Sequence, residues 1–325
     1  MPLHSFLIAN ARGAFADSQK RSSLLYLFSS NSYVFSFFSD THLPIADIPF
    51  LKLKYKNSFW SSSPTSPMCG VGFILRDDVV VISTREKLFT IDQEHDRARA
   101  LEVRIKLCSS SLRLIGIYAP AVPALRPLFF TALLAWLLED GECLQDNVLL
   151  VGDFNCVVDP VRDRCPAHRY ADRGTPELVQ IIDTFALCDM WRKLHPLVQE
   201  HTYFAQSHSS RIDLVLASPG CEDWIRSMSL SPYFYLDHLT ISFSLSPPSP
   251  LNSPPPPWHF DNRVLRDEHC LNYLRDAWKV AALSPHCARL SPTLKFMFCE
   301  AHLLLAAKHI SLVHKRYISR KRSYL

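Results

Sequence analysis

The sequence lacks the short motifs that mark several common enzyme classes. It contains no G-x-x-x-x-G-K-[ST] phosphate loop, no G-x-G-x-x-G dinucleotide fingerprint and no H-E-x-x-H helix motif. No group of its Cys and His residues has the spacing of a structural zinc site. These absences argue against P-loop nucleotide hydrolases, dinucleotide-dependent enzymes and zinc proteins, and we expect no small-molecule cofactor.

The ten cysteines form no C-x-x-C pair, and no secretory signal is apparent. Cys108, Cys156 and Cys188 lie inside apolar runs, which predicts small buried core residues. The first residues, MPLHSFLIANARGAF, lack a basic start followed by a long apolar stretch. We therefore expect reduced thiols and an intracellular protein, nuclear or cytoplasmic. An organelle transit peptide is the less favoured alternative for this Arg- and Ser-bearing N-terminus.

The composition is that of a folded protein with a substantial core, since 48% of the residues are hydrophobic and 20 are Phe. The net charge of +4 is compatible with a polyanionic partner without requiring one. The stretch LLYLFSSNSYVFSFF is interrupted by Ser and Asn and is too short for a membrane span, so no membrane partner is expected.

A proline-rich segment divides the chain. The sequence SPPSPLNSPPPP can neither continue a helix nor pair in a sheet, which predicts a linker over 247–257 between a body at 1–246 and a piece at 258–325. Residues 263–280 and 293–316 both have helical spacing, which predicts a helical extension. The terminal cluster KRYISRKR is interpreted as a solvated helix end in preference to a nucleic-acid contact.

Strand patterns outnumber helix patterns in the body. HSFLIA, YVFSFF, GVGFILRDDVVVIS, RALEVRIKL, SLRLIGIYAP, HTYF, RIDLVLAS and HLTISFSLS predict strands, with a Ser-rich hairpin turn between RALEVRIKL and SLRLIGIYAP. SQKRSSLLYLFSS, PLFFTALLAWLLED and TPELVQIIDTFAL predict helices, the last with Thr175 as N-cap and Pro176 at its first position. This balance favours an α/β sandwich with mixed sheets over a doubly wound parallel sheet.

Polar residues recur at the ends of these strands. After the buried strand VLLV, Gly152 is followed by Asp153 and Asn155, which strand alternation places on one side. The others are Asn10, Asp40, His42, Tyr118, Asp213, Asp237 and His238. Each alone is an ordinary turn residue. Together they suit a metal-dependent phosphodiesterase, which needs carboxylates for a hard cation, a base for water, and donors for the phosphate.

Five of these motifs occur in an order and spacing that resemble a known family. GDFN at 152–155, the T-H-L after the acid at 40, IYAP at 117–120, SRID at 210–213 and DH at 237–238 resemble the endonuclease/exonuclease/phosphatase superfamily. The likeness is to the apurinic-type endonuclease domain of LINE-type (non-LTR) retrotransposon polyproteins. It implies a four-layer α/β sandwich, two packed mixed sheets flanked by helices, with the catalytic loops along one edge.

The resemblance also implies roles for single residues. Asp40, Asn10 and Asp237 would hold Mg²⁺ (or Mn²⁺), and Tyr118 would contact the phosphate. Asp153 would orient or deprotonate the attacking water, Asn155 would bind phosphate oxygens, and Asp213 would pair with His238. Thr202, Arg211 and Asn155 would contact DNA. WHFDNRVL resembles the segment that leads to the reverse transcriptase in such polyproteins, and 258–325 has no paired-aspartate polymerase motif.

Two positions depart from the family pattern. The family has Glu at the position of Asp40, one methylene longer, and Ser at the position of Leu236. Because Mg²⁺ needs near-ideal ligand geometry, both changes predict reduced activity.

The first hypothesis is a divalent-metal-dependent DNA endonuclease, expected as a monomer, that nicks one strand and leaves a 3′ hydroxyl for reverse transcription. The second is a catalytically impaired DNA-binding relic of the same fold. The third is a phosphatase, exonuclease or deadenylase on the same scaffold.

Overall fold

The structure is a computed structural model of the whole chain. It describes residues 4–30, 33–63, 68–92, 95–108, 110–139, 147–167, 170–233, 236–247 and 266–284, and beyond these the positions 288, 292, 295, 296, 299, 303, 306, 307 and 310. Its contacts form two compact units, one of residues 1–183 and 187–252 and the other of residues 184–186 and 253–325.

Two six-stranded sheets form the first unit. Sheet A has the order β14-β15-β1-β2-β4-β3 and contains β1 (His4–Asn10), β2 (Phe35–Ser39), β3 (Ser58–Ser61), β4 (Val71–Leu75), β14 (Ile225–Ser231) and β15 (Thr240–Leu245). Sheet B has the order β10-β13-β8-β7-β6-β5 and contains β5 (Val80–Asp92), β6 (His95–Leu107), β7 (Ser110–Tyr118), β8 (Val148–Asp153), β10 (Cys188–Asp189) and β13 (Asp213–Ala217). Both sheets are mixed, because β1 runs parallel to β2 and β7 runs parallel to β8 while their other pairs are antiparallel.

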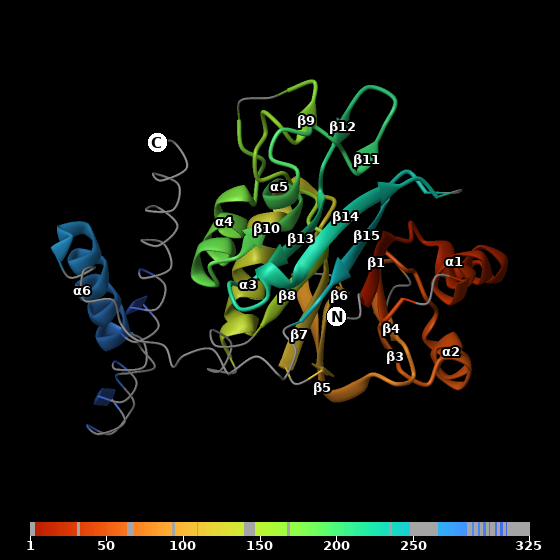
Figure 1. Cartoon of the computed structure of the whole chain (residues 1–325), viewed down its shortest axis with the longest axis horizontal. Coiled ribbons are helices and arrows are strands. Elements are labelled where there is room, and N and C mark those ends of the chain that lie inside the picture. Colours follow the sequence, from red (N-terminus) through yellow and green to blue (C-terminus); the bar gives the residue numbers. More distant parts are fainter. Residues whose placement is uncertain are drawn as a thin grey trace. The chain divides into compact units, whose positions relative to one another are not determined.

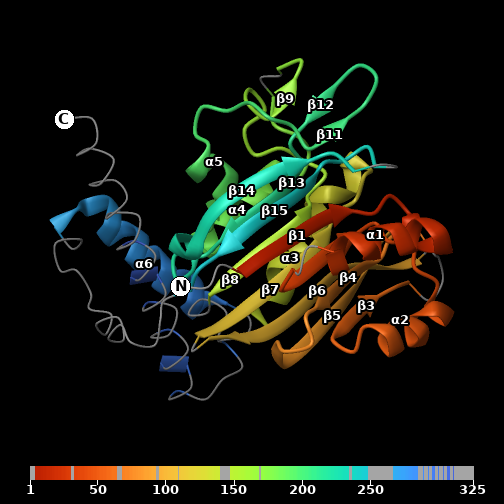
Figure 2. The ribbon, with the colours of Figure 1, turned by 45° about the vertical axis from the view of Figure 1, so that its right-hand side comes forward.

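Helices cover the outer faces of the two sheets. In Figure 1, α1 (Ser18–Ser30) and α2 (Ile48–Lys54) lie on one side, and α3 (Arg126–Leu138) and α4 (Thr175–Thr184) on the other. A small sheet of β9 (Arg164–Cys165), β11 (Tyr203–Phe204) and β12 (Ser209–Ser210) lies beyond one end of the large sheets (Figure 2), and α5 (Met190–Leu194) follows β10. Single 3-10 turns occur at Ala14–Ala16, Ile45–Asp47, Pro123–Leu125 and Glu222–Trp224. The predicted sandwich of two mixed sheets flanked by helices is confirmed.

The main core lies between the sheets and is rich in Phe from sheet A. Phe6, Phe35, Phe37 and Phe73 are fully buried there, opposite aliphatic side chains of sheet B. Figure 2 shows sheet A passing in front of β7 and β8. At roughly 1.5–3 kcal/mol for each buried large side chain, this layer is the main favourable term in holding the sheets together.

Phe37 packs against two glycines of the opposite sheet. A Cβ on Gly116 of β7 would be 2.0 Å from Phe37 Cε2, and a Cβ on Gly152 of β8 would be 2.9 Å from its Cε1. These residues have no side chain because the ring takes the space. Gly152 has a second constraint, since its φ of +129° is rarely open to other residues and its Cβ would be 2.1 Å from the carbonyl oxygen of Ile117.

Two local expectations are wrong. Thr175 does not cap α4 from outside; it is the first helical residue, and its hydroxyl donates to the carbonyl oxygen of Val157, which fixes the helix to the loop after β8. Cys108 is not a core residue. It is exposed at the turn between β6 and β7 with a φ of +57°. Cys156 is buried as predicted, and Cys188 is partly exposed.

The second unit contains α6 (Glu268–Leu283), which confirms a helix beyond the proline-rich segment. Asp267 caps it by accepting from the backbone N–H of His269 and Cys270. Leu274 packs with Ala306 and Ala307. The linker after residue 247 and the basic cluster KRYISRKR lie outside the described residues. Among the helices that the structure describes, none has the length and apolarity that crossing a membrane requires.

We predict that residues 1–246 fold without the rest of the chain, because the layer between the sheets is built from residues before 246. A protein ending at Ser246 should unfold cooperatively within a few degrees of the full chain, measured by calorimetry and circular dichroism. A molten or insoluble product would show that residues after 246 complete the core.

Candidate active site

The predicted site residues meet where the ends of both sheets converge. Tyr118 ends β7 and Asp153 ends β8, and their parallel register pairs these two residues directly. Asp213 begins β13, which runs antiparallel to β8 and is paired with Asp153. One row across sheet B therefore holds Tyr118, Asp153 and Asp213. Asn10 ends β1 in sheet A, and His238 lies just before β15, which pairs with β1.

Asp153 is held at the centre of this group by two amides. It is 1% exposed, and its Oδ2 accepts from Asn10 Nδ2 at 2.8 Å and from Asn155 Nδ2 at 3.2 Å. The backbone N–H of Asn155 donates to Asp153 Oδ1 at 2.8 Å. Asn155 is therefore brought back to Asp153 by a tight Asx turn with a φ of +49°, not by the strand alternation expected from the sequence, because β8 has already ended.

Asp213 and His238 form a buried pair. His238 Nδ1 lies 2.7 Å from Asp213 Oδ2, and the side chains are 7% and 3% exposed respectively. Tyr203 packs its ring 5.0 Å from the His238 ring. With Nδ1 occupied by the carboxylate, Nε2 is the nitrogen left for a reacting group.

The pKa values of Asp153 and His238 are both raised within this group, for different reasons. Burial raises the pKa of Asp153 to about 7, and the nearby Asp213 carboxylate adds to this. Burial alone would lower the pKa of His238, but the carboxylates of Asp213, Asp153 and Asp237 raise it to about 9. At neutral pH, His238 is therefore an imidazolium, and Asp153 titrates near neutrality.

Thr202 and Arg211, predicted to contact DNA, are both 1% exposed, and Thr202 instead supports Asp213 from inside. The Thr202 hydroxyl accepts from the backbone N–H of Ile212 and Asp213 at 3.2 and 3.1 Å. Contacts of Thr202 and Arg211 with DNA are not supported, because neither side chain reaches the surface.

The Arg211 guanidinium is fully used by two carboxylates. It donates to Asp163 through Nε and Nη2, both at 2.9 Å, and to Asp189 at 2.6 and 3.2 Å. Charge-assisted bonds of this fork geometry are among the stronger ones in proteins. They raise the pKa of Arg211 against the opposing effect of burial, and Arg211 also lowers the pKa of Asp163 in the same way.

Tyr118 is close to the carboxylates of both Asp40 and Asp153. Burial raises the pKa of Tyr118 well above its ordinary value, and the carboxylates of Asp40 and Asp153 raise it further, so the phenol remains a hydrogen-bond donor. Asp40 has a φ of +49°, and its Oδ1 lies 2.9 Å from His42 Nε2. His42 thus contacts the predicted metal carboxylate, a role that the sequence did not assign.

Asp237 carries an unsatisfied oxygen. Its Oδ2 is 3.3 Å from Arg12 Nε, whereas its Oδ1 is buried and has no hydrogen-bond partner. An orphaned buried carboxylate oxygen beside further carboxylates is the environment that a hard cation would satisfy. The backbone N–H of Arg12 donates to Asn10 Oδ1, so Arg12 joins both residues.

The geometry offers one group that could hold a metal among the residues that the structure describes. The ligand atoms of Asp153, Asp213 and His238 lie within 4.8 Å of one another. This group differs from the predicted ligands Asp40, Asn10 and Asp237. The donor set of the whole site, four carboxylates and two amides beside the imidazoles of His42 and His238, fits Mg²⁺ or Mn²⁺, which prefer oxygen.

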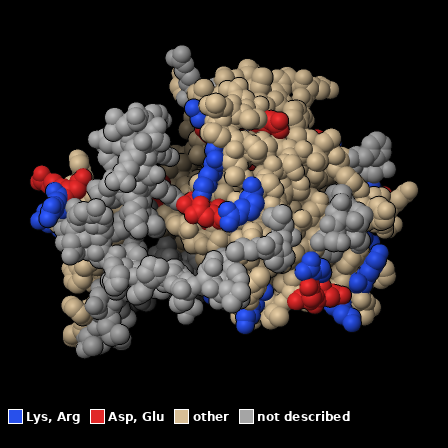
Figure 3. Space-filling model, in the orientation of Figure 1, with Lys and Arg blue, Asp and Glu red and all other residues tan. Residues whose placement is uncertain are grey.

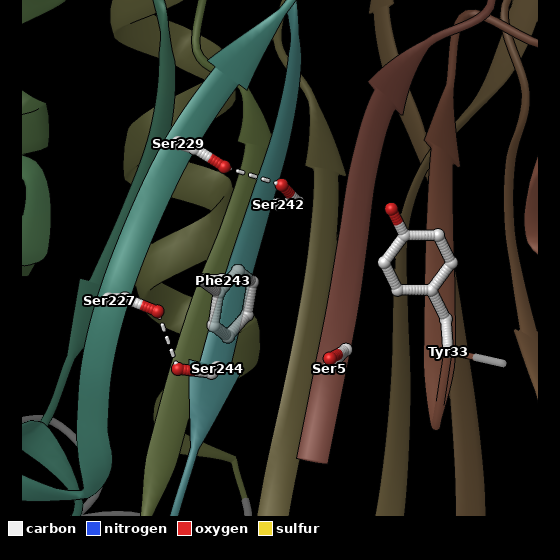
Figure 4. Close-up of a pocket in the computed structure, with 7 residues that line it drawn as sticks. All are labelled: Ser5, Tyr33, Ser227, Ser229, Ser242, Phe243 and Ser244. Carbon is white, nitrogen blue, oxygen red and sulfur yellow. Dashed lines mark hydrogen bonds between the residues drawn. The ribbon is translucent and has the colours of Figure 1, made fainter. Parts of the chain in front are cut away.

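A pocket of about 220 Å³ lies elsewhere, on a face of sheet A (Figure 4). It is lined by Ser5, Tyr33, Ser227, Ser229, Ser242, Phe243 and Ser244. Hydrogen bonds between serine hydroxyl groups join β14 and β15, at 2.7 Å from Ser227 to Ser244 and 2.8 Å from Ser229 to Ser242. This lining contains no charged group and none of the predicted site residues, so we do not assign phosphate chemistry to it.

Comparison with known proteins agrees with the predicted family. A model of the Endonuclease/Exonuclease/phosphatase family matches residues 12–232. The Transposon TX1 uncharacterized 149 kDa protein of Xenopus laevis is 28% identical over 258 residues. That match covers 76% of this chain but only 18% of the relative, so the chain spans less than a fifth of that protein.

Solved structures share the fold at low identity. The 3′ phosphatase NExo from Neisseria, bound to a product DNA hairpin, has a TM-score of 0.61 and 16% identity, covering 75% of this chain and 99% of that one. The AP endonuclease LMAP from Leishmania major has a TM-score of 0.58 and 13% identity, covering 76% and 88% respectively. An AP endonuclease from Archaeoglobus fulgidus has a TM-score of 0.55 and 15% identity, covering 74% and 99%.

The family model covers more than half of the chain, and the sheets, the motif order and the converging carboxylates agree with it. The chain belongs to the Endonuclease/Exonuclease/phosphatase family.

Proposed function

We propose that the chain is a divalent-metal-dependent DNA endonuclease that hydrolyses a phosphodiester bond and nicks one strand. The observation that carries the proposal is the buried Asp213–His238 pair beside Asp153, whose carboxylate is oriented by Asn10 and Asn155. The TX1 relative supports a transposon origin, and the DNA hairpin bound to NExo supports a nucleic-acid substrate.

The pKa values of Asp153 and His238 indicate a different catalytic role for each side chain. Asp153, whose pKa is raised to about 7, can be ionised near neutrality and accept a proton from a water molecule. His238, whose pKa is raised to about 9, carries a positive charge and can stabilise negative charge on a phosphate oxygen through Nε2. Asp213 keeps the imidazole charged and fixes its orientation.

Tyr118 and Asn155 are the proposed neutral phosphate ligands. Tyr118 keeps its proton. The half-buried Asn155 donates from Nδ2 to Asp153 and to the carbonyl oxygen of Ala119, so it would exchange the longer bond, to Asp153, for a bond to a phosphate oxygen. Asp40, Asn10 and Asp237 are the proposed residues around a cation, which when bound would offset charge on the phosphate oxygens.

One face of the molecule carries few charged side chains. On the face in Figure 3, the described Lys and Arg side chains occur in small groups, some beside Asp and Glu, within a largely uncharged surface. We expect DNA affinity to depend on phosphate contacts and to fall with salt.

A phosphatase or 3′ exonuclease is the second candidate, since NExo is described as a 3′ phosphatase and a 3′-5′ exonuclease. Supercoiled plasmid, a duplex with an abasic site and a duplex with a 3′ phosphate, each tested with Mg²⁺, separate the candidates. Conversion of supercoiled to open-circular plasmid, with no release of phosphate or nucleotides, is the outcome that the endonuclease proposal requires.

His238→Ala and Asp153→Asn should each lower the nicking rate by about 10²-fold or more, because acid–base and charge-stabilising groups act mainly in the transition state. DNA affinity, measured by anisotropy on an uncleaved duplex, should change much less. Ser229→Ala on the remote serine face is the matched control. Equal losses of affinity and rate would indicate that these residues only support the fold.

Stability without metal should fall as pH rises. Because the folded pKa of His238 is about 9 against 6.5 for the free side chain, its contribution is complete below pH 6.5 and is lost as pH rises through 9. In EDTA, urea unfolding should lose on the order of 3 kcal/mol over this window. In Asp213→Asn the loss should shrink, and the His238 ring should titrate near its ordinary value by NMR. A flat pH profile in the natural chain would contradict the buried ion pair.

Asp40→Glu should bind Mg²⁺ more tightly and nick faster than the natural chain, because the added methylene restores the family carboxylate. Mn²⁺ tolerates less regular ligation, so it should partly rescue the natural chain and add little to the variant. Nicking rates across Mg²⁺ and Mn²⁺ titrations measure this. If Asp40→Glu is no better in either metal, residue 40 does not limit activity, and Leu236→Ser is the next variant.

A further inference from the structure

Arg99 is a buried cation next to Tyr118 that the site described so far does not use. It is 8% exposed and lies on β6, one residue beyond the last pair of β6 with β7, Ala100 with Ile117. Its Nη1 donates to the carbonyl oxygen of Tyr118 at 3.1 Å, and its guanidinium carbon is 5.3 Å from the centre of the Tyr118 ring. It therefore contacts both the backbone and the ring of the proposed phosphate ligand.

A β-bulge places Arg99 in this position. On β5, Lys87 pairs with Ala100 and Leu88 with Ala98, so one step on β5 corresponds to two on β6 and Arg99 is the extra residue. Bulges redirect a side chain and are frequent beside active sites. The carbonyl oxygen of Ala98 accepts from the N–H of Gly70, and the loop at Cys69 and Gly70 in turn pairs with the backbone of Thr41 and His42. The bulge thus lies between Tyr118 and the segment that carries Asp40.

The charge of Arg99 has no internal counter-ion among the described residues. Arg113 and Arg211 are also buried, but each has a carboxylate partner: Glu102 at 2.7 Å for Arg113, and Asp163 and Asp189 for Arg211. Arg99 has only a carbonyl oxygen and a ring, and its Nε is buried without a hydrogen-bond partner. A buried guanidinium without an anion is costly, so chains normally pair such a group or use it.

We propose that Arg99 binds the scissile phosphate group of the substrate and positions Tyr118 against it, an inference that rests on the proposed phosphodiester chemistry. A phosphate monoanion supplies the missing counter-ion and can accept from the guanidinium fork, for which Arg suits phosphate better than Lys does. The bond to the Tyr118 carbonyl and the contact with its ring fix both groups in one orientation before the substrate arrives.

The test compares Arg99→Gln and Arg99→Lys with Lys106→Gln. Lys106 lies on the same strand and is exposed, so its substitution removes the same charge away from the site. The first readout is the slope of log Kd against log salt for an uncleaved duplex in EDTA, which needs no turnover. The second is the nicking rate with Mg²⁺, resolved into kcat and KM, and thermal melts report folding.

We expect Arg99→Gln to reduce the salt slope by about one unit, because one phosphate contact is lost. Its kcat/KM should fall by about 10²-fold, the effect of losing a donor to the reacting group. Arg99→Lys should restore the salt slope but not kcat, since an ammonium keeps the charge without the fork or the stacking. Lys106→Gln should leave kcat/KM unchanged.

A salt slope in Arg99→Gln equal to that of the natural chain, with only a lower melting temperature, would overturn the proposal and make Arg99 structural. If Arg99→Gln does not fold, the kcat of Arg99→Lys decides: natural turnover in that variant overturns the proposal. The binding readout also separates the two failures. A natural chain that never nicks refutes the endonuclease, whereas a natural chain that nicks with unchanged slopes in Arg99→Gln refutes only the role of Arg99.

Discussion

The site depends on the parallel pairing of two strands at the centre of each sheet. β1 with β2 and β7 with β8 run in the same direction within their pairs, so each pair ends its strands at one place. Asn10, Tyr118 and Asp153 come from these ends, and Asp40 follows the end of β2 directly. The antiparallel neighbours β13 and β15 begin where those strands end, which brings in Asp213 and His238. Six segments distant in sequence therefore supply one site without long loops.

Collecting carboxylates in a buried place is unfavourable unless each one is compensated. Asp153 is compensated by two amides and by the nearby imidazolium of His238, which in turn is paired with Asp213. Asp213 is held from behind by the Thr202 hydroxyl and by the backbone of a segment anchored through Arg211. The Asp237 Oδ1 atom is left without such a partner, and the Arg99 guanidinium lacks an anion. Among the described residues of the site, two groups of opposite charge therefore lack a full partner.

Most of the fold was predictable because strand and helix periodicity reflect burial, and the ordered motifs identified the family. Contacts between distant residues were not predictable in this way. Arg211 looked like a DNA contact, since its partner Asp163 is 48 residues away and no local pattern shows the pairing. Asn155 reaches Asp153 through a turn that alternation does not describe. Arg12 and His42 lie beside motif residues in the sequence, and this proximity could have identified them as members of the site. The bulge at Arg99, in contrast, leaves no recognisable pattern in RALEVRIKL.

The packing of Phe37 against Gly116 and Gly152 has a consequence for how this domain can diverge. The catalytic groups are divided between the two sheets. The Phe37 ring of sheet A packs directly against the backbone of Gly116 and Gly152 in sheet B, and this contact sets the distance between the sheets. Substitution of either glycine by a larger residue would push the two sheets apart, although every catalytic residue would still be present in the sequence. In copies of such a domain, intact motifs alone would then be a poor guide to function, and the residues at these two glycines would be a better indicator of which copies retain a working geometry.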